Sequence, residues 1–353
     1  MTAASSALSA PLSPALSAPL DAGRILERCR ELVAPALADA VGRLHPWVGE
    51  MAAYSFGWCE VGGAAAVAPG GKGVRQALAV LGAEASGAPG RAGVPAAVAV
   101  ELVHAFSLLH DDIMDGDQAR RGRPAVWRAY GTGPAVLAGD GLFALAVGTL
   151  AAAPSGGRAV RMLSVALGDL VHGQADDLLF AGRPWTGPRR VRPEEYRSMA
   201  EGKTGSLLGC SLALGALLGG AAPPTVAALD RAGRRLGIAF QIVDDVLGIW
   251  GDTAVTGKPV HADLRERRKT FPVLAALAST GPQAHRLAAL LETGDEPEEA
   301  AALIEAVGGR SAALAEAHRL IAAAETALAE APLEGGAREE LRSLVGFLVR
   351  RER

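Results

Sequence analysis

The chain contains few aromatic residues and few cysteines, and both shortages limit the structural classes to which the protein can belong. Phe, Trp and Tyr make up 4% of 353 residues although half of the chain is hydrophobic, and alanine supplies much of that half. This balance favours helix over sheet. The three cysteines, Cys29, Cys59 and Cys210, lie far apart without paired spacing. The sequence therefore argues against zinc fingers and a disulfide framework, and it fits a reducing cytoplasm.

The chain also lacks an excess of basic residues and a clear membrane-spanning segment. Its formal net charge is −3, so nothing indicates a nucleic-acid partner. The longest uncharged run, 204–229, is rich in Gly and Ala and is interrupted by Pro223-Pro224. We interpret this run as a buried core helix rather than as a membrane-spanning segment.

Residues 1–20 form a Ser/Ala/Pro tract in which the sequence LSAPL occurs twice. No Lys or Arg lies near its start, so it does not resemble a secretory signal. Because this composition cannot bury a core, we expect a disordered tail. Two interpretations stay open for it, a passive extension and a docking peptide that orders on a partner.

From residue 21 onward the pattern is helical nearly everywhere, and we expect 21–353 to form one all-α domain. Gly and Pro punctuate it at 68–73, 87–94, 131–134, 154–157, 181–193 and 219–224. No convincing strand alternation and no Asn-Gly hairpin signal is present. The architecture that best fits the pattern is a helical bundle around a central cavity.

Two acidic clusters stand out within this helical pattern. Asp111, Asp112 and Asp115 follow the apolar run Val94 to Leu109, at spacings that let their oxygens reach one point from a helix. A second pair, Asp244-Asp245, ends another apolar helical pattern. Carboxylates gathered in this way repel one another unless a cation lies between them, and Mg²⁺ prefers carboxylates together with substrate phosphates. Either cluster alone could be a solvated helix end, but two clusters facing one cavity would hold metal ions and a diphosphate.

Lysine is the scarcest charged residue, and its few positions are informative. The chain has only Lys72, Lys203, Lys258 and Lys269, and each has Gly or Thr as a neighbour. Lys is a compact point charge that binds phosphate, whereas Arg is a planar fork. Lys72 also lies in a glycine-rich turn before Arg75, where a helix N-terminus favours an anion. Together with Arg120-Arg121, these lysines provide cations for two diphosphate groups, although any one alone could be an exposed loop charge.

These motifs resemble those of the trans-isoprenyl diphosphate synthases, or polyprenyl synthetases, over about residues 70–272. The matching positions, in the order expected for that family, are Gly71-Lys72, Arg75, His104, Asp111, Asp112, Asp115, Arg120-Arg121, Gln174, Asp177, Lys203-Thr204, Gln241, Asp244, Asp245, Lys258 and Lys269.

The resemblance implies an all-helical, homodimeric, cytoplasmic enzyme that condenses isopentenyl diphosphate with an allylic diphosphate. It implies that Asp111, Asp115 and Asp244 hold Mg²⁺, three ions per site, with Asp112 and Asp245 in support. The residues implied for the allylic diphosphate are Arg120, Lys203, Lys258 and Lys269, with Thr204 and Gln241 beside them. Those implied for isopentenyl diphosphate are Lys72, Arg75, His104 and Arg121. Some bacterial relatives are enclosed in protein shells through N-terminal tails, which gives residues 1–20 one further hypothesis.

The sequence departs from the family pattern at two positions. Gly248 stands where the second acidic motif usually has a third Asp, and Asp252 lies too far along the helix to replace it. Gly73 replaces the Arg that commonly follows the loop lysine. The first departure weakens one metal site or leaves it to water, and the second removes a cation from the isopentenyl diphosphate side.

Two other functions deserve comparison. A class I terpene cyclase shares the helical fold, but it uses one diphosphate substrate and would not need Lys72, Arg75 and His104. Its usual Asn/Ser/Glu metal motif is absent, because Asp244-Asp245 occupies that place. A weakly active partner subunit of another synthase would typically have lost its aspartates, whereas this chain keeps five of the usual six.

The product length is predicted from the residues before the first acidic cluster. Phe106 lies five residues before Asp111, about 7.5 Å deeper along a helix axis, and the neighbouring Ser107 is small. In the family this pair resembles the C20 pattern, geranylgeranyl diphosphate, whereas two adjacent rings resemble C15. The alternative is that Phe106 is an ordinary core residue.

Overall fold

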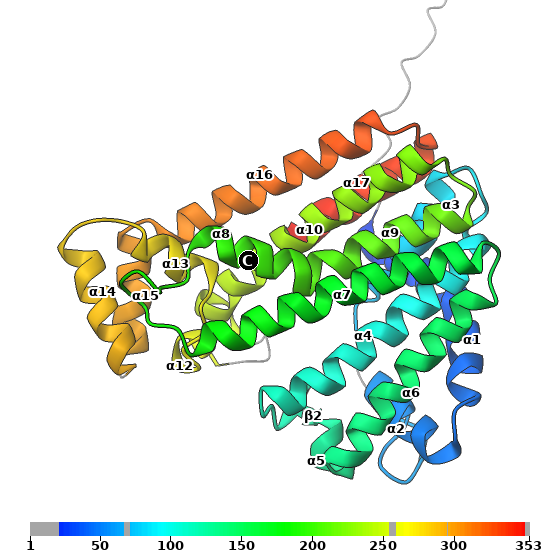
Figure 1. The fold of residues 1–353 in the computed structure, drawn as a ribbon, viewed down its shortest axis with the longest axis horizontal. Coiled ribbons are helices and arrows are strands. Elements are labelled where there is room, and N and C mark those ends of the chain that lie inside the picture. The colour runs from blue at the N-terminus through cyan, green and yellow to red at the C-terminus, as the bar shows by residue number, and fades with distance from the viewer. Residues whose placement is uncertain (1–20, 67–70, 254–258, 295, 350–353) are drawn as a thin grey trace, which may run out of the picture.

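The computed structural model describes residues 21–66, 71–253, 259–294 and 296–349. Over these ranges the chain is a bundle of α-helices with one very short strand pair, which confirms the predicted all-α class (Figure 1). The expectations for residues 1–20 and for Lys258 concern positions outside the described residues.

The N-terminal half comprises helices α1 to α7 and a small hairpin. Their bounds are α1 Ala22–Gly42, α2 Pro46–Phe56, α3 Val74–Ala85, the 3-10 turn η1 Gly90–Gly93, α4 Val94–Met114, β1 Ala119–Arg120, β2 Arg123–Pro124, α5 Val126–Tyr130, α6 Thr132–Ala151 and α7 Gly156–Ala181. In the C-terminal half, all regular secondary structure of the described residues is helical. Its elements are α8 Pro193–Ala200, the π-helical segment η2 Glu201–Gly205, α9 Ser206–Leu218, α10 Pro223–Trp250, α12 Ala262–Arg265, α13 Phe271–Leu277, α14 Pro282–Thr293, α15 Pro297–Ala306, α16 Gly309–Glu330 and α17 Gly335–Val349.

Helix starts fall within the Gly/Pro stretches or directly after them, as the sequence predicts. Helices α3, α4, α6, α7, α8 and α10 begin at Val74, Val94, Thr132, Gly156, Pro193 and Pro223. Proline occupies the first helical turn of α4, α8 and α10, where its missing N–H has no intrahelical partner to lose. The helical periodicity and its punctuation are therefore sufficient to locate these helices.

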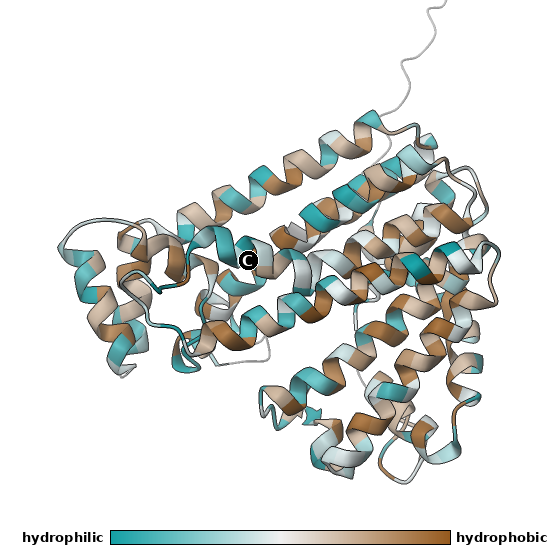
Figure 2. Ribbon diagram, in the orientation of Figure 1, coloured by the Kyte–Doolittle hydropathy of each residue, from teal (hydrophilic) through white to brown (hydrophobic). Residues whose placement is uncertain are grey.

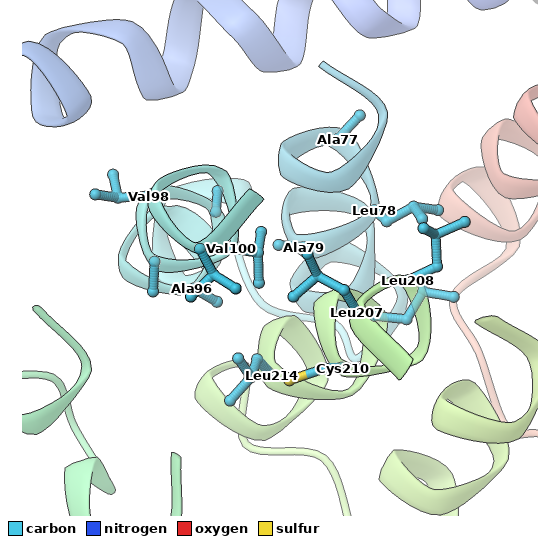
Figure 3. Packing of buried hydrophobic residues seen from close by; sticks show 14 of the residues in the cluster. Ala77, Leu78, Ala79, Ala96, Val98, Val100, Leu207, Leu208, Cys210 and Leu214 are labelled. Carbon is cyan, nitrogen blue, oxygen red and sulfur yellow. The ribbon is translucent and has the colours of Figure 1, made fainter. Parts of the chain in front are cut away.

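The largest core cluster joins α3, α4 and α9, which cross closely (Figure 3). Ala79 of α3 lies against α9, and a side chain at Gly215 would overlap the Ala79 carbonyl oxygen. All but one of the residues of α9 are buried, in agreement with the core helix predicted within 204–229. Small residues therefore let the backbones approach, and Leu208 and Leu214 fill the remaining space.

Two smaller clusters extend the core toward the end of the bundle formed by α12 to α15 (Figure 1). Tyr196 of α8, Val243 of α10 and Phe271 of α13 belong to the first. Ile249 and Leu264 join the second, which connects the end of α10 to α12. Helices α7, α9, α10 and α16 run roughly along one another between the two ends of the molecule. The three clusters together pack around the C-terminal parts of α4 and α10.

Two helices pass a test of length and hydropathy for a membrane span, the stretch 90–114 containing α4 and Thr132–Ala151. Of the most apolar window, 56% is buried inside the protein in the first and 33% in the second. The first is thus a core helix of the bundle. Apolar side chains remain exposed on α6 and α7, including Leu137, Phe143, Val165, Val171 and Leu179. Hydrophobic residues of these two helices appear as brown segments of the ribbon in Figure 2.

Candidate functional site

A cavity of about 510 Å³ opens between the acidic and basic motifs predicted from the sequence. Aromatic side chains on its wall include Tyr54, Phe56, Trp58 and Phe240. The predicted site residues that line it are Lys72, Arg75, His104, Ser107, Asp111, Asp112, Arg120, Arg121, Lys203, Thr204, Gln241 and Asp244. The fold thus brings both acidic clusters and two groups of cations to one place.

The aspartates of α4 differ in what they contact. Burial raises the pKa of Asp111 to about 6, with nearby Lys203 opposing and Asp115 adding to the rise. Asp112 is buried and forms an ion pair with Arg120, whose Nε donates to Oδ1 at 2.6 Å. Asp115 caps the C-terminus of the helix, and Nη2 of Arg268 lies 3.8 Å from its carboxylate. Asp111 and Asp112 both line the cavity, and Asp112 also holds Arg120 in place.

The two aspartates of the second pair, on α10, also differ in what they contact. Asp244 lines the cavity, whereas Asp245 is buried and is not a lining residue. The carboxylate of Asp245 accepts hydrogen bonds from the Tyr196 hydroxyl at 2.5 Å, the Phe271 N–H at 2.8 Å and the Gln241 amide at 3.3 Å. Burial and the nearby Asp263 raise its pKa to about 8, and these three donors oppose the rise. In each cluster the second aspartate is buried and holds neighbouring side chains, but only in the second cluster is it absent from the cavity lining.

The donor set fits a hard divalent cation. Asp111 and Asp244 provide carboxylate oxygens from facing helices on one cavity. Within the described residues, no group of three or more acidic, His or Cys side chains is arranged to hold an ion by itself. Mg²⁺ keeps several waters and is usually bound by one or two carboxylates plus substrate phosphates, so this sparse set suits it.

Arg120 and Arg121 sit in the short hairpin β1–β2, an element that the sequence pattern did not indicate. Arg121 and Gly122 form its turn with φ of 54° and 75°, the conformation of tight hairpins. Strands of two residues are too short to show alternating hydrophobicity, and Arg-Gly is a weak turn signal. The sequence pattern therefore gave no indication of this hairpin. The turn directs Arg121 toward the glycine loop, where a Cβ on Gly71 would lie 2.8 Å from its Nη2.

The backbone conformation of the glycine loop accounts for the glycine at position 73, directly after Lys72. Gly73 caps α3 with φ of 68°, a backbone conformation that residues other than glycine adopt at a cost in free energy. A Cβ there would also overlap Nε2 of Gln76. An arginine at this position would therefore adopt a strained backbone conformation and would require the Gln76 side chain to move. Nζ of Lys72 lies 5.6 Å above the Phe347 ring, so the C-terminal helix α17 lies beside the glycine loop.

Arg75 and His104 complete this basic side. Arg75 is half-buried, and its buried Nε has no hydrogen-bond partner in the described part of the chain. Desolvation lowers its pKa, and Glu101 opposes the shift. Burial and the three nearby arginines hold the pKa of His104 well below its usual value, so its imidazole is neutral at pH 7. The neutral ring leaves the positive charge here to the arginines and Lys72.

The π-helical segment η2 carries Lys203 and Thr204 into the cavity. Such single-turn widenings of a helix are frequent at functional sites. Nζ of Lys203 lies 2.5 Å from Oδ2 of Asp177, and the Thr204 hydroxyl donates to Oε1 of Gln241 at 2.8 Å. Glycine at 173 allows this, because a Cβ there would overlap the Lys203 backbone nitrogen. Gln174 is buried beside them, and its amide nitrogen has no partner among the described residues.

Four of the predicted site residues in the described part of the chain lie away from the cavity lining: Asp115 and Asp245, whose contacts are given above, and Lys269 and Phe106. Nζ of Lys269 stacks 3.1 Å above the Trp185 ring centroid, and burial lowers its pKa to about 8. Phe106 packs between α4 and α6, with ring centroids 4.7 Å from His110 and 5.7 Å from Phe143. Its neighbour Ser107 does line the cavity.

Three contributing residues were missed by the sequence reasoning. Glu101 is half-buried near Arg75, and its Oε1 accepts a hydrogen bond from the Gln76 N–H at 3.2 Å. A single acid within the apolar run 94–109 was a visible signal for it. Tyr196 and Arg268 carried no such signal, because their partners Asp245 and Asp115 are remote in sequence.

Comparison with known proteins gives consistent matches. The family model described as polyprenyl synthetase matches residues 58–307. The chain is 45% identical over 275 residues to a geranylgeranyl diphosphate synthase of Mycobacterium tuberculosis, covering 77% of each chain. It is 42% identical over 338 residues to a (2E,6E)-farnesyl diphosphate synthase of Mycobacterium bovis, covering 93% of each. A solved polyprenyl synthetase from Streptomyces coelicolor superposes with a TM-score of 0.88 at 45% identity, over 93% of this chain and all of that one.

Proposed function

The chain belongs to the polyprenyl synthetase family and is a trans-isoprenyl diphosphate synthase, and on that premise we propose which residues perform the reaction and what the product is. The enzyme elongates an allylic diphosphate with isopentenyl diphosphate. We propose that the allylic diphosphate binds between Asp111, Asp244 and Lys203. One observation carries this proposal: carboxylates from α4 and α10 face one cavity that also holds two separate groups of cations.

The cations divide the cavity into two anion sites. Lys203 and Arg120 lie with the acidic clusters, and they would stabilise charge on the departing diphosphate. Lys72, Arg75 and Arg121 form the other group near neutral His104, and they would hold isopentenyl diphosphate. Lys258 and Lys269 remain proposed contacts of the allylic diphosphate, and Lys269 would have to leave the Trp185 ring to reach it.

Asp111, Asp115 and Asp244 would hold the divalent ions, which neutralise the diphosphate and favour its departure. When the allylic C–O bond breaks, its electron pair leaves with the diphosphate. The alkene of isopentenyl diphosphate then attacks the carbocation, and one proton is lost to the released diphosphate. The aromatic and aliphatic wall, with Phe56, Trp58 and Leu108, excludes water that would quench the cation.

We propose geranylgeranyl diphosphate, C20, as the product. The named relatives include both geranylgeranyl and farnesyl synthases, so the family alone does not decide between C20 and C15. Support comes from Phe106 beside the small Ser107. Product chromatography after incubation with isopentenyl diphosphate and each allylic primer tests this directly. A cyclised hydrocarbon from one substrate alone would instead support a terpene cyclase, and no product would support a partner subunit.

We further propose a homodimer formed through α6 and α7. These two helices pack on each other and share exposed apolar side chains, with Leu137 50%, Val165 62% and Leu179 68% exposed. A patch of this kind on adjacent helices is typical of a protein interface. A second copy of the chain is the occupant that the family resemblance implies. Light scattering on the purified protein would give twice the chain mass of 36.0 kDa if this holds.

A further inference from the structure

Arg121 reaches the cavity from an element that is too small to hold its shape alone. Strands β1 and β2 form two residue pairs, Ala119 with Pro124 and Arg120 with Arg123. A two-stranded hairpin by itself is marginally stable in water. In the described part of the chain, the Arg121 side chain has no hydrogen bond or ion pair of its own. The direction of Arg121 therefore depends on what holds the hairpin.

The first strand of the hairpin has an anchor on α4. Nε of Arg120 donates to Oδ1 of Asp112 at 2.6 Å, and this carboxylate is buried. The contact fixes the strand that precedes the turn. The strand that follows Arg121 needs an anchor of its own.

Arg123 anchors the second strand to the C-terminus of α2. Its Nη1 donates to the Tyr54 carbonyl at 3.1 Å, and its Nη2 donates to the Cys59 carbonyl at 2.8 Å. Tyr54 lies in the last turn of α2, where carbonyl groups lack an α-helical partner and a cation is favoured. The side chain of Arg123 is only 18% exposed. One guanidinium thus joins the hairpin to the end of a helix and to the loop that follows it.

Tyr54 donates a hydrogen bond back to the same strand. Its hydroxyl donates to the Pro124 carbonyl at 2.9 Å. Cζ of Arg123 lies 4.0 Å from the centroid of the Tyr54 ring, within the range of a cation–π interaction. Tyr54 is buried, and its ring packs edge-on against Tyr130 of α5 at 5.5 Å. The hairpin and α2 are therefore connected in both directions through one buried aromatic residue.

A further contact of Arg123, to Oε2 of Glu60 at 3.0 Å, differs from these. The Glu60 side chain is 59% exposed, and an ion pair with so exposed a carboxylate contributes little to stability. The interactions that fix the strand are thus those with two carbonyl groups and a ring.

We propose that Arg123 is a positioning residue for isopentenyl diphosphate. Through its contacts with Tyr54 and the loop after α2, it fixes the hairpin turn so that Arg121 points at the glycine loop of Lys72. Arg121 reaches that loop, because a Cβ on Gly71 would lie 2.8 Å from its Nη2. This inference rests on the proposed function of the cavity and deepens it.

Loss of the Arg123 anchor should affect one substrate more than the other. A preformed site loses less entropy when its ligand binds, so a loosened turn should weaken binding more than it slows the chemical step. Arg120 keeps its own bond to Asp112, so the proposed allylic site should change little. The expected signature is a raised KM for isopentenyl diphosphate alone.

Steady-state kinetics of a double-mutant cycle tests the proposal. Arg123→Ala should raise KM for isopentenyl diphosphate about tenfold, with kcat and the allylic KM within about twofold of the wild type. Arg121→Ala should raise the same KM at least as much. The double variant R121A/R123A should lie within about twofold of Arg121→Ala, because Arg123 acts through Arg121.

Three milder variants complete the experiment. Arg123→Lys keeps the charge but not the planar fork, so it should recover part of the lost affinity. Tyr54→Phe loses only the bond to Pro124 and should raise KM for isopentenyl diphosphate about three- to fivefold. Glu60→Ala is the matched control: it removes the exposed partner of Arg123 and should leave every constant unchanged.

The proposal is overturned by a wild-type KM in folded Arg123→Ala, or by effects of Arg121→Ala and Arg123→Ala that multiply in the double variant. A purely structural role of Arg123 would lower the melting temperature and change both KM values alike, which also overturns it. If Arg123→Ala does not fold, Arg123→Lys takes its place in the cycle. An unchanged KM in Arg121→Ala would refute the assignment of Arg121 in the proposed function and this inference with it, whereas multiplying effects refute the inference alone.

Discussion

The hydroxyl of Tyr196 on α8 donates a 2.5 Å hydrogen bond to Oδ2 of Asp245 on α10, in the interior of the protein. Both side chains are buried, at 1% and 5% exposure. The same carboxylate accepts from the Phe271 N–H at the start of α13. One aspartate of the second acidic motif therefore joins three helices, and its neighbour Asp244 reaches the cavity from a backbone that these contacts hold.

Tyr196→Phe should destabilise the protein by about 1–3 kcal/mol, because it leaves a buried carboxylate with one donor fewer. Thermal and denaturant unfolding measure the loss. Tyr130→Phe is the matched control, since its hydroxyl donates to Glu50 at 2.9 Å in a less buried place. Equal losses in the two variants would contradict the structural role assigned to Asp245.

Asp111→Ala and Asp244→Ala should each lower kcat by at least about 100-fold with Mg²⁺ present. Each removes a carboxylate from the cavity whose bound ion is needed as the diphosphate leaves. Steady-state kinetics with both substrates measures the change. Asp39→Ala, on an exposed position of α1, should be normal. Near-normal kcat in either cavity variant would rule out the proposed metal site.

Divalent-cation binding should weaken as the pH falls through about 6. Burial raises the pKa of Asp111 to about 6, so this carboxyl is charged above that pH and protonated below it. Because one proton must leave for the ion to bind, Mn²⁺ affinity should drop up to about tenfold per pH unit below the pKa. Calorimetry between pH 5 and 8 measures it. Asp111→Asn should remove this dependence, and a flat wild-type profile would refute it.

Lys72→Ala and Lys203→Ala should affect different substrates. Lys72 belongs to the glycine loop beside α3, so its loss should chiefly raise KM for isopentenyl diphosphate. Lys203 contacts Asp177 and lies near Asp111, so its loss should impair the allylic substrate. Separate KM measurements for the two substrates test this. The two-site assignment fails if both variants change the same constant to the same extent.

Product length should respond to residues 106 and 107. Ser107→Phe places a ring on the cavity lining and should shorten the product toward C15. Phe106→Ala removes a ring packed against His110 and Phe143, and it should open space and lengthen the product. Chromatography of dephosphorylated products gives the lengths. If neither spectrum changes, another wall of the cavity stops the growing chain.

The sequence by itself determined the helices and the identity of most cavity residues. Helical periodicity and Gly/Pro punctuation are local properties, so they located the starts of α4, α6, α7 and α10. The spacing of Asp111 and Asp115 indicated metal binding, and the positions of the few lysines indicated diphosphate binding. These signals depend on a few adjacent residues and on the chemical character of each side chain.

Only the tertiary structure decided how the aspartates divide their roles. Asp245 meets Tyr196 across 49 residues of sequence, Lys269 meets Trp185, and Asp263 fills the space beside Gly248. Each relationship joins different helices or loops, and no local pattern encodes which side chains the packing brings together. The sequence pattern marks Gly248 as a departure from the family motif, but it does not show that the Asp263 carboxylate packs against this glycine. The packed bundle brings another carboxylate to that place, because close packing brings a group from another helix into the space that glycine leaves.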